Sequence, residues 1–173
     1  MTIPVVVETD LGAFTIAVDD SRAPVTAGNF LAYVDGRHLD GAVVYRIVTM
    51  ANQPPETVHR IEVVQWGLQA SEDKPAPFPP IAHETTEATG IRHRHMTVSM
   101  ARLAPGTAGS EFFICIGDQP ELDFGGRRNP DGQGFAAFGT VVAGEETVMR
   151  LFGAAQSTEA LNQPIPISHV RRG

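Results

Sequence analysis

The stretch AGSEFFICI, residues 108–116, places one carboxylate directly before an unbroken apolar run. In an extended strand, successive side chains point to opposite faces. Phe112 and Ile114 are therefore expected on one face, which is apolar and typical of a protein core. Glu111 and Phe113 are expected on the other face. A charge beside a large aromatic ring suits neither a buried layer nor a fully solvated one, so this face is a candidate floor of a groove.

The rest of the chain is predicted to form short strands and two helices. Residues 24–34 are predicted to form a helix with one apolar stripe, which begins at Ala23-Pro24 and is ended by Asp35-Gly36. Residues 145–152 are predicted to form a second helix. Many short strands without regular βαβ alternation favour an antiparallel barrel or sandwich. The other predicted strands cover residues 4–8, 13–18, 41–48, 61–68, 96–102, 135–142 and 165–171, with Val44, Arg46 and Val48 on one face of the third of them.

Length and composition bound the class of protein. With 173 residues, the chain is long enough for one domain with a substantial core and too short for two, so we expect a single domain over residues 1–173. The formal net charge of −7 would repel phosphate backbones, so no nucleic acid is expected as a partner. Because no apolar stretch approaches the roughly 20 residues of a membrane helix, no membrane partner is expected either.

Cysteine usage and the first residues bear on the compartment. Cys115 is the only cysteine, so no internal disulfide can form, and its place in an apolar strand favours a core residue over a nucleophile. The first residues, MTIPVVVETD, lack the basic start, apolar stretch and cleavage site of a secretory signal. This predicts a cytoplasmic protein if the chain is full length. A mature exported form with an added Met would have the same sequence, so a periplasmic location is the alternative.

Several separated motifs resemble those of the cyclophilins, the peptidyl-prolyl cis-trans isomerases, in sequence and in order. They are TDLGAFTIAVD, APVTAGNFLAYVDG, YRIV, the Gln of VQWG, SMAR, GSEFFICI, ELDFGG, GFAAFGTVV and ETVMRLF. The resemblance implies a mainly β protein, a closed eight-stranded antiparallel barrel capped by two α-helices, with its active groove on the outside. It also implies a monomer that accelerates rotation about Xaa-Pro bonds in proline-containing peptides and folding proteins.

The resemblance implies which side chains form that groove. Arg46 matches the catalytic arginine of the family, Gln65 matches a glutamine that binds the peptide and positions the arginine, and Phe113 matches the floor of the proline pocket. The implied substrate-binding residues are Val63, Ala101, Arg102, Glu111, Leu122 and Phe135. Without the resemblance, Arg46 would read as a surface residue whose stem covers apolar side chains.

The reaction itself needs little covalent chemistry. An Xaa-Pro bond has partial double-bond character and a rotation barrier of ~18 to 20 kcal/mol. Since no bond breaks, we expect no nucleophile, no metal and no cofactor. A fixed guanidinium beside an apolar pocket can hold the proline ring and donate to the prolyl nitrogen as it loses conjugation. Catalysis is then stronger binding of the twisted state than of either planar isomer.

Several positions depart from the family pattern. Glu111 stands where the family usually has Gln, Phe135 where many members have His, and Glu121 where many eukaryotic members have Trp near the groove. Glu62 falls where a pocket aromatic is usual. Because Glu111 is expected on the same surface as Arg46, we predict that its carboxylate accepts hydrogen bonds from the guanidinium. The missing tryptophan predicts weak binding of cyclosporin-type cyclic peptides.

Two other functions remain open from the sequence. The same barrel could be a catalytically weak module that binds proline-containing segments or acts as a chaperone, because the pocket positions are altered. A metal protein could use His83, His93 and His95, and the last two could point the same way on a strand. No cysteine or repeating ligand spacing lies nearby to support the metal site.

Overall fold

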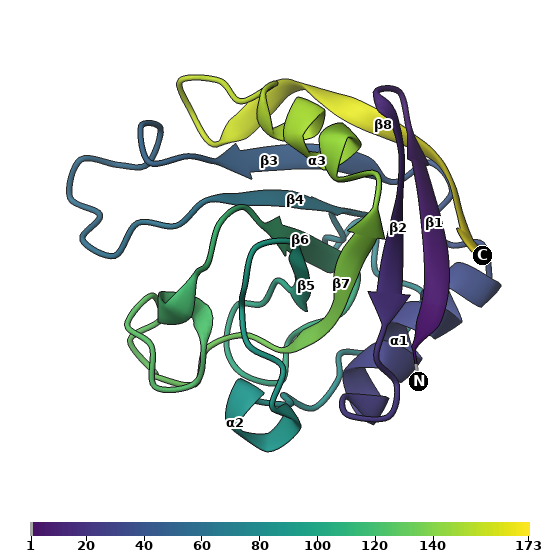
Figure 1. Ribbon diagram of the computed structural model, residues 1–173, viewed down its shortest axis with the longest axis horizontal. Coiled ribbons are helices and arrows are strands. Elements are labelled where there is room, and N and C mark those ends of the chain that lie inside the picture. The colour runs from purple at the N-terminus through teal and green to yellow at the C-terminus, as the bar shows by residue number, and fades with distance from the viewer. Residues whose placement is uncertain (1) are drawn as a thin grey trace.

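Runs of β-branched and aromatic residues, separated by turns, form eight antiparallel strands that close into a barrel (Figure 1). This computed structural model describes residues 2–173. Around the barrel the strand order is β1-β2-β7-β5-β6-β4-β3-β8, and β8 returns to pair with β1. The strands are β1 (Ile3–Thr9), β2 (Gly12–Val18), β3 (Val43–Val48), β4 (Val63–Gly67), β5 (Thr97–Met100), β6 (Glu111–Cys115), β7 (Ala137–Ala143) and β8 (Ala160–Arg172). The predicted closed antiparallel barrel is confirmed.

Both predicted helices are present, and a third, single-turn helix accompanies them. The helices are α1 (Pro24–Asp35), α2 (Thr86–Thr89) and α3 (Glu145–Phe152). In Figure 1, α1 lies at the lower end of the barrel, where it packs against β7 and β8, and α3 lies near the top, against β2 and β4. The sequence analysis missed α2, which is bracketed by the Thr85 side chain as N-cap and by Gly90 in the left-handed conformation.

Aromatic rings fill the barrel and attach α1 to it. Phe30 of α1 meets Phe112 edge to face at a centroid distance of 5.0 Å and Trp66 at 6.0 Å, and it lies 5.0 Å from Phe138. All four rings are buried. Such edge-to-face pairs add about 0.5 to 1.5 kcal/mol each beyond the burial of apolar area. The helix therefore closes one end of the core that the strands enclose.

Strand β6 has the alternation that the sequence predicted. Phe112 and Ile114 belong to the barrel core. Phe113 and Cys115 point the other way, into a second apolar cluster. We call this second set the outer cluster; it consists of Val48, Ile61, Val63, Phe113, Cys115 and Leu122.

Strand β3 departs from simple alternation. The prediction that Val44, Arg46 and Val48 share one face is wrong, because Val44 belongs to the barrel core while Val48 belongs to the outer cluster. Val44 pairs with Trp66, and Arg46 pairs with the β4 residue just before it, so Tyr45 is an extra residue on β3. This bulge resets the alternation and leaves Arg46 on the outer face with Val48.

No helix among residues 2–173 combines the length and the apolar character needed to cross a membrane.

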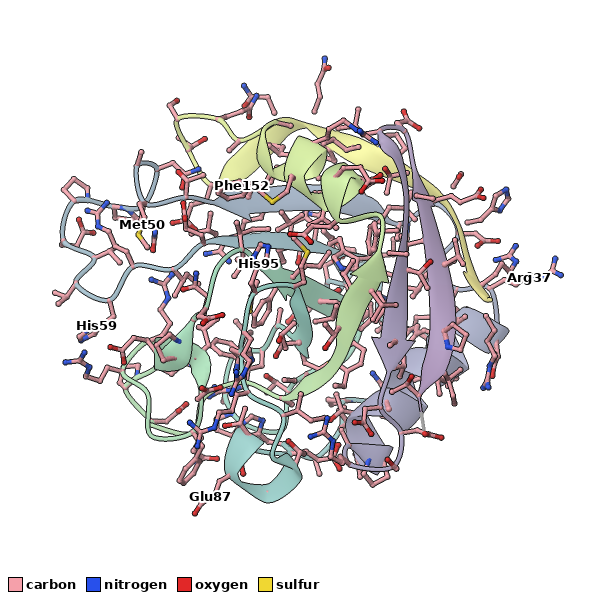
Figure 2. All side chains as sticks on the ribbon, viewed as in Figure 1. Arg37, Met50, His59, Glu87, His95 and Phe152 are labelled. Carbon is pink, nitrogen blue, oxygen red and sulfur yellow. The ribbon has the colours of Figure 1, made fainter. Side chains whose placement is uncertain are left out.

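A long connection between β3 and β4 projects from the barrel in Figure 1, and Figure 2 labels Met50 and His59 on it. Residues 116–136, which join β6 to β7 through the short 3-10 helix η1 (Pro120–Leu122), project on the same side. These two connections flank the outer cluster.

Candidate active site

Three predicted catalytic residues form one row across adjacent strands. Arg46 of β3 pairs with Gln65 of β4, and Gln65 pairs with Phe113 of β6. Cross-strand partners have Cβ atoms about 4.5 to 5.5 Å apart, so the register alone brings the guanidinium, the amide and the ring together. The row lies on the outer face of the barrel, as the resemblance implied.

The Arg46 guanidinium is held by two side chains. Its Nη1 donates to Gln65 Oε1 at 2.7 Å, and its Nε donates to Glu159 Oε1 at 2.9 Å, with Nη2 bonded to the same oxygen. Glu159 reaches this position because the backbone amide of Ile47 donates to its carbonyl, 2.9 Å away, where β3 meets β8. The planar fork of an arginine suits such a two-sided grip.

Glu111 is not the partner of Arg46, so the predicted Arg46–Glu111 hydrogen bond is wrong. The Glu111 carboxylate accepts a hydrogen bond from Ser110 Oγ at 2.6 Å and from the backbone amide of Ala70 at 3.0 Å. The reason lies in the register: Glu111 pairs with Gly67, two residues farther along β4 than Gln65. The carboxylate is therefore displaced along the strands from the guanidinium.

A cleft of about 330 Å³ opens over the row. Eight of the nine predicted site residues line it: Arg46, Val63, Gln65, Ala101, Arg102, Phe113, Leu122 and Phe135. Four lining residues were missed by the sequence analysis: Ile61, Leu103, Arg128 and Asn129. Glu111 instead lines a neighbouring cavity of about 610 Å³, which shares Gln65, Ala101, Arg102 and Leu103 with the cleft. The two cavities are therefore neighbours on one side of the barrel.

Aromatic and aliphatic side chains make the cleft apolar. Phe135 meets Phe113 edge to face at 5.4 Å, and the Arg102 guanidinium lies 5.1 Å from the centre of the Phe135 ring. Leu122 is fully buried beside them. Glu62 does not line this wall, since its carboxylate accepts from the backbone amide of Met50 at 3.2 Å. Its neighbour Ile61 supplies the apolar surface there.

The Gln65 amide links the Arg46 guanidinium to the phenol of Tyr45. Its Nε2 donates to Tyr45 Oη at 2.7 Å while its Oε1 accepts from Arg46. Burial raises the pKa of Tyr45 to about 12, so the phenol stays protonated at neutral pH. The bulge places Tyr45 beside Arg46, and the resulting Tyr45–Gln65–Arg46 chain fixes the orientation of the amide.

A buried histidine backs the aromatic floor. His93 stacks on Phe113 with centroids 5.9 Å apart and planes inclined by 12°. Its Nδ1 lies 2.8 Å from Asp123 Oδ1 and its Nε2 lies 2.8 Å from Ser99 Oγ. Burial lowers the pKa of His93, so the ring is neutral, donating to Asp123 and accepting from Ser99. Sequence reasoning named His93 only as a metal ligand and missed this support of Phe113.

We expect this histidine to make stability depend on pH. In the unfolded chain His93 has the ordinary histidine pKa of about 6.5, and the folded pKa is lower. Below about pH 6.5 the unfolded chain therefore takes up a proton that the folded chain does not, and the free energy of unfolding falls by up to ~1.4 kcal/mol per pH unit. Denaturant unfolding between pH 7 and 5 measures this slope. His93→Gln should flatten it, and an equal slope in the variant would contradict the assignment.

The three histidines of the alternative metal site do not converge. His83 Nε2 lies 3.1 Å from the carbonyl oxygen of Gln133, while His95, labelled in Figure 2, has its Nε2 2.6 Å from Glu145 Oε1. In the described part of the chain, no group of three or more His, Cys, Asp or Glu side chains is placed to hold a metal ion. The geometry therefore does not favour a metal site formed by these three histidines.

The structure combines a closed barrel, an external apolar cleft and a hydrogen-bonded arginine at the cleft, which is the arrangement implied by the resemblance to the cyclophilins. The family profile "Cyclophilin type peptidyl-prolyl cis-trans isomerase/CLD" matches residues 4–172. The chain therefore belongs to the cyclophilin-type peptidyl-prolyl cis-trans isomerase family.

Named relatives agree with this assignment, and a solved structure shares the fold. "Peptidyl-prolyl cis-trans isomerase cyp18" of Streptomyces antibioticus is 29% identical over 94% of this chain and 90% of its own length. "Peptidyl-prolyl cis-trans isomerase B" of Escherichia coli (strain K12) is 27% identical over 91% of this chain and 89% of its own. A Cryptosporidium parvum cyclophilin crystallised in the presence of the dipeptide Ala-Pro is 20% identical, covers 98% of both chains and superposes with a TM-score of 0.74, which shows the shared fold.

Proposed function

We propose that the cleft carries the isomerase activity of the family through Arg46, Gln65 and Phe113. The single observation that carries this proposal is the cross-strand row, which sets a fixed guanidinium beside an apolar cleft. The proline ring packs on Phe113 between Leu122 and Val63. Arg46 donates to the prolyl nitrogen as that nitrogen becomes pyramidal, and Gln65 keeps the guanidinium aimed at it. Ala101 and Arg102 contact the peptide before the proline.

The guanidinium alone cannot supply all the free energy by which the twisted state must be stabilised. An acceleration of about a hundred-thousandfold requires ~7 kcal/mol of preference for the twisted state. One charged hydrogen bond contributes ~1.5 to 3 kcal/mol. The shape of the cleft and the exclusion of water from it must therefore supply the larger share, which agrees with the burial of Phe113 and Leu122.

Proline-containing peptides and folding proteins are the proposed substrates. In support, the Cryptosporidium parvum protein of the same fold was crystallised in the presence of Ala-Pro. Cyclosporin-type cyclic peptides should bind weakly, because Glu121 replaces the tryptophan of many relatives and its carboxylate is bonded to Arg127 outside the cleft. No cofactor is required by this mechanism.

We expect the protein to accelerate a refolding reaction that is limited by a prolyl isomerisation. Uncatalysed prolyl steps take tens to hundreds of seconds at 25 °C, so a catalyst is easily seen against this background. The measurement is the rate of the slow refolding phase of a test protein at increasing concentrations of this chain. Slow-phase rates that stay constant while the test protein binds would instead identify a binding or chaperone module.

A further inference from the structure

Positive charge is in excess among the residues that line the cleft. Three arginines line it, namely Arg46, Arg102 and Arg128, and no Asp or Glu is among the lining residues of the described chain. Arg46 is paired with Glu159 and Arg102 with Asp131. Arg128 differs from both, because its hydrogen bonds go only to neutral oxygens.

Arg128 is held rigidly by the connection between β3 and β4. Its Nη1 donates to Gln53 Oε1 at 2.9 Å and to the carbonyl oxygen of His59 at 3.0 Å. Gln53 is itself buried, and its Nε2 donates to the carbonyl oxygens of Thr49 at 2.8 Å and Ile61 at 2.9 Å. The guanidinium is therefore preorganised at the cleft wall, and its Nε and Nη2 have no hydrogen-bond partner among the described residues.

Two further observations favour an anionic or hydrogen-bond-accepting group at this wall of the cleft. Desolvation by burial, and then the positive charge of Arg46, lower the pKa of Arg128, and the more weakly acting charge of Glu159 only partly offsets them. The side-chain nitrogen of Asn129, which also lines the cleft, is a buried donor without a hydrogen-bond partner among the described residues. A buried donor without a partner is unfavourable until an acceptor reaches it.

We propose that Arg128 is a specificity-determining residue that selects prolyl peptides carrying an anionic group, a carboxylate or a phosphate, on a residue next to the proline. This inference rests on the proposed function of the same cleft. The net charge of the whole chain is −7, so general electrostatics would favour cationic peptides. A preference for anionic peptides must then come from local groups, of which Arg128 is the cleft arginine with no carboxylate in direct contact among the described residues.

The test compares matched peptides in binding and in exchange. Dissociation constants are measured by NMR titration for peptides with Glu or Gln, and with phosphoserine or Ser, placed before or after the proline. Wild type should bind the anionic member of a pair about fivefold more tightly in at least one position, as expected for a partly exposed ion pair. The carboxylate and phosphate arms show which source the site prefers. The preference should shrink in about 1 M salt.

Matched variants separate Arg128 from overall charge. Arg128→Gln should abolish the preference, and Arg128→Lys should restore part of it. Arg127→Gln makes the same change in net charge at the preceding residue, whose side chain is 69% exposed and paired with Glu121, and this variant should keep the preference. Equal affinities within every pair for wild type, or a preference that survives in Arg128→Gln, would overturn the proposal. If wild type binds the anionic peptides preferentially but accelerates cis-trans exchange in none of the peptides, only the proposed isomerase mechanism is refuted.

Discussion

Arg46→Ala should lower the turnover of an Xaa-Pro peptide by at least roughly a hundredfold, which corresponds to ~2.7 kcal/mol of lost transition-state stabilisation. The loss is this large because the variant removes the charged donor to the prolyl nitrogen and also releases Gln65 and Glu159, which Arg46 now bridges. A peptide isomerisation assay at saturating substrate measures it. Affinity for the ground-state peptide should change less, because the apolar cleft remains.

Two controls make this result interpretable. Arg46→Lys retains the charge but cannot reach Gln65 and Glu159 together, so we expect at least a tenfold loss, or ~1.4 kcal/mol. The free energy of unfolding of both variants shows whether the fold is intact. Turnover within about twofold of wild type in a folded Arg46→Ala protein would assign the catalytic role to another group.

Phe112→Ala should lower the free energy of unfolding by about 3 to 5 kcal/mol. Phe112 is fully buried and packs edge to face on Phe30, with Trp66 at 4.9 Å and Phe138 at 6.2 Å. Removing the ring leaves a cavity at the centre of the barrel, where strands constrain the collapse of neighbouring side chains. Denaturant unfolding at one pH measures the change.

An exposed apolar residue provides the matched control. Leu103 is 90% exposed at the rim of the groove, so Leu103→Ala should change the free energy of unfolding by less than about 0.5 kcal/mol. The folded fraction of Phe112→Ala should keep its turnover, because the ring points away from the cleft. A loss below about 1 kcal/mol would show that the barrel interior is not packed as described.

Local pattern predicted most of the barrel because each strand carries its own alternation. Strand β6 is the clearest case, with its core and cleft residues separated as expected. Strand β8 runs over Ala160–Arg172 and is longer than the predicted residues 165–171. Pro164, just before the predicted strand, suggests a break, since proline lacks an amide donor. The closed barrel nevertheless continues the strand, which pairs with β3 in its first part and with β1 in its second.

The family motifs predicted the cleft better than they predicted its hydrogen bonds. Arg46, Gln65 and Phe113 lie in one row because the motifs fix the strand register. Glu159 was missed because it comes from a segment 113 residues away in sequence, brought in by the pairing of β3 with β8. The bulge at Tyr45 was also missed, since a bulge is defined by the pairing between two strands, which the sequence of one strand does not reveal.

The most direct test of the account is exchange spectroscopy on an Xaa-Pro peptide, with wild type and Arg46→Ala measured side by side at the same enzyme concentration. We predict that wild type produces strong cis-trans exchange cross-peaks, whereas the variant binds the peptide with little added exchange. Wild-type protein that binds the peptide without accelerating exchange, or a variant that accelerates it equally, would contradict the central role of the guanidinium at the cleft.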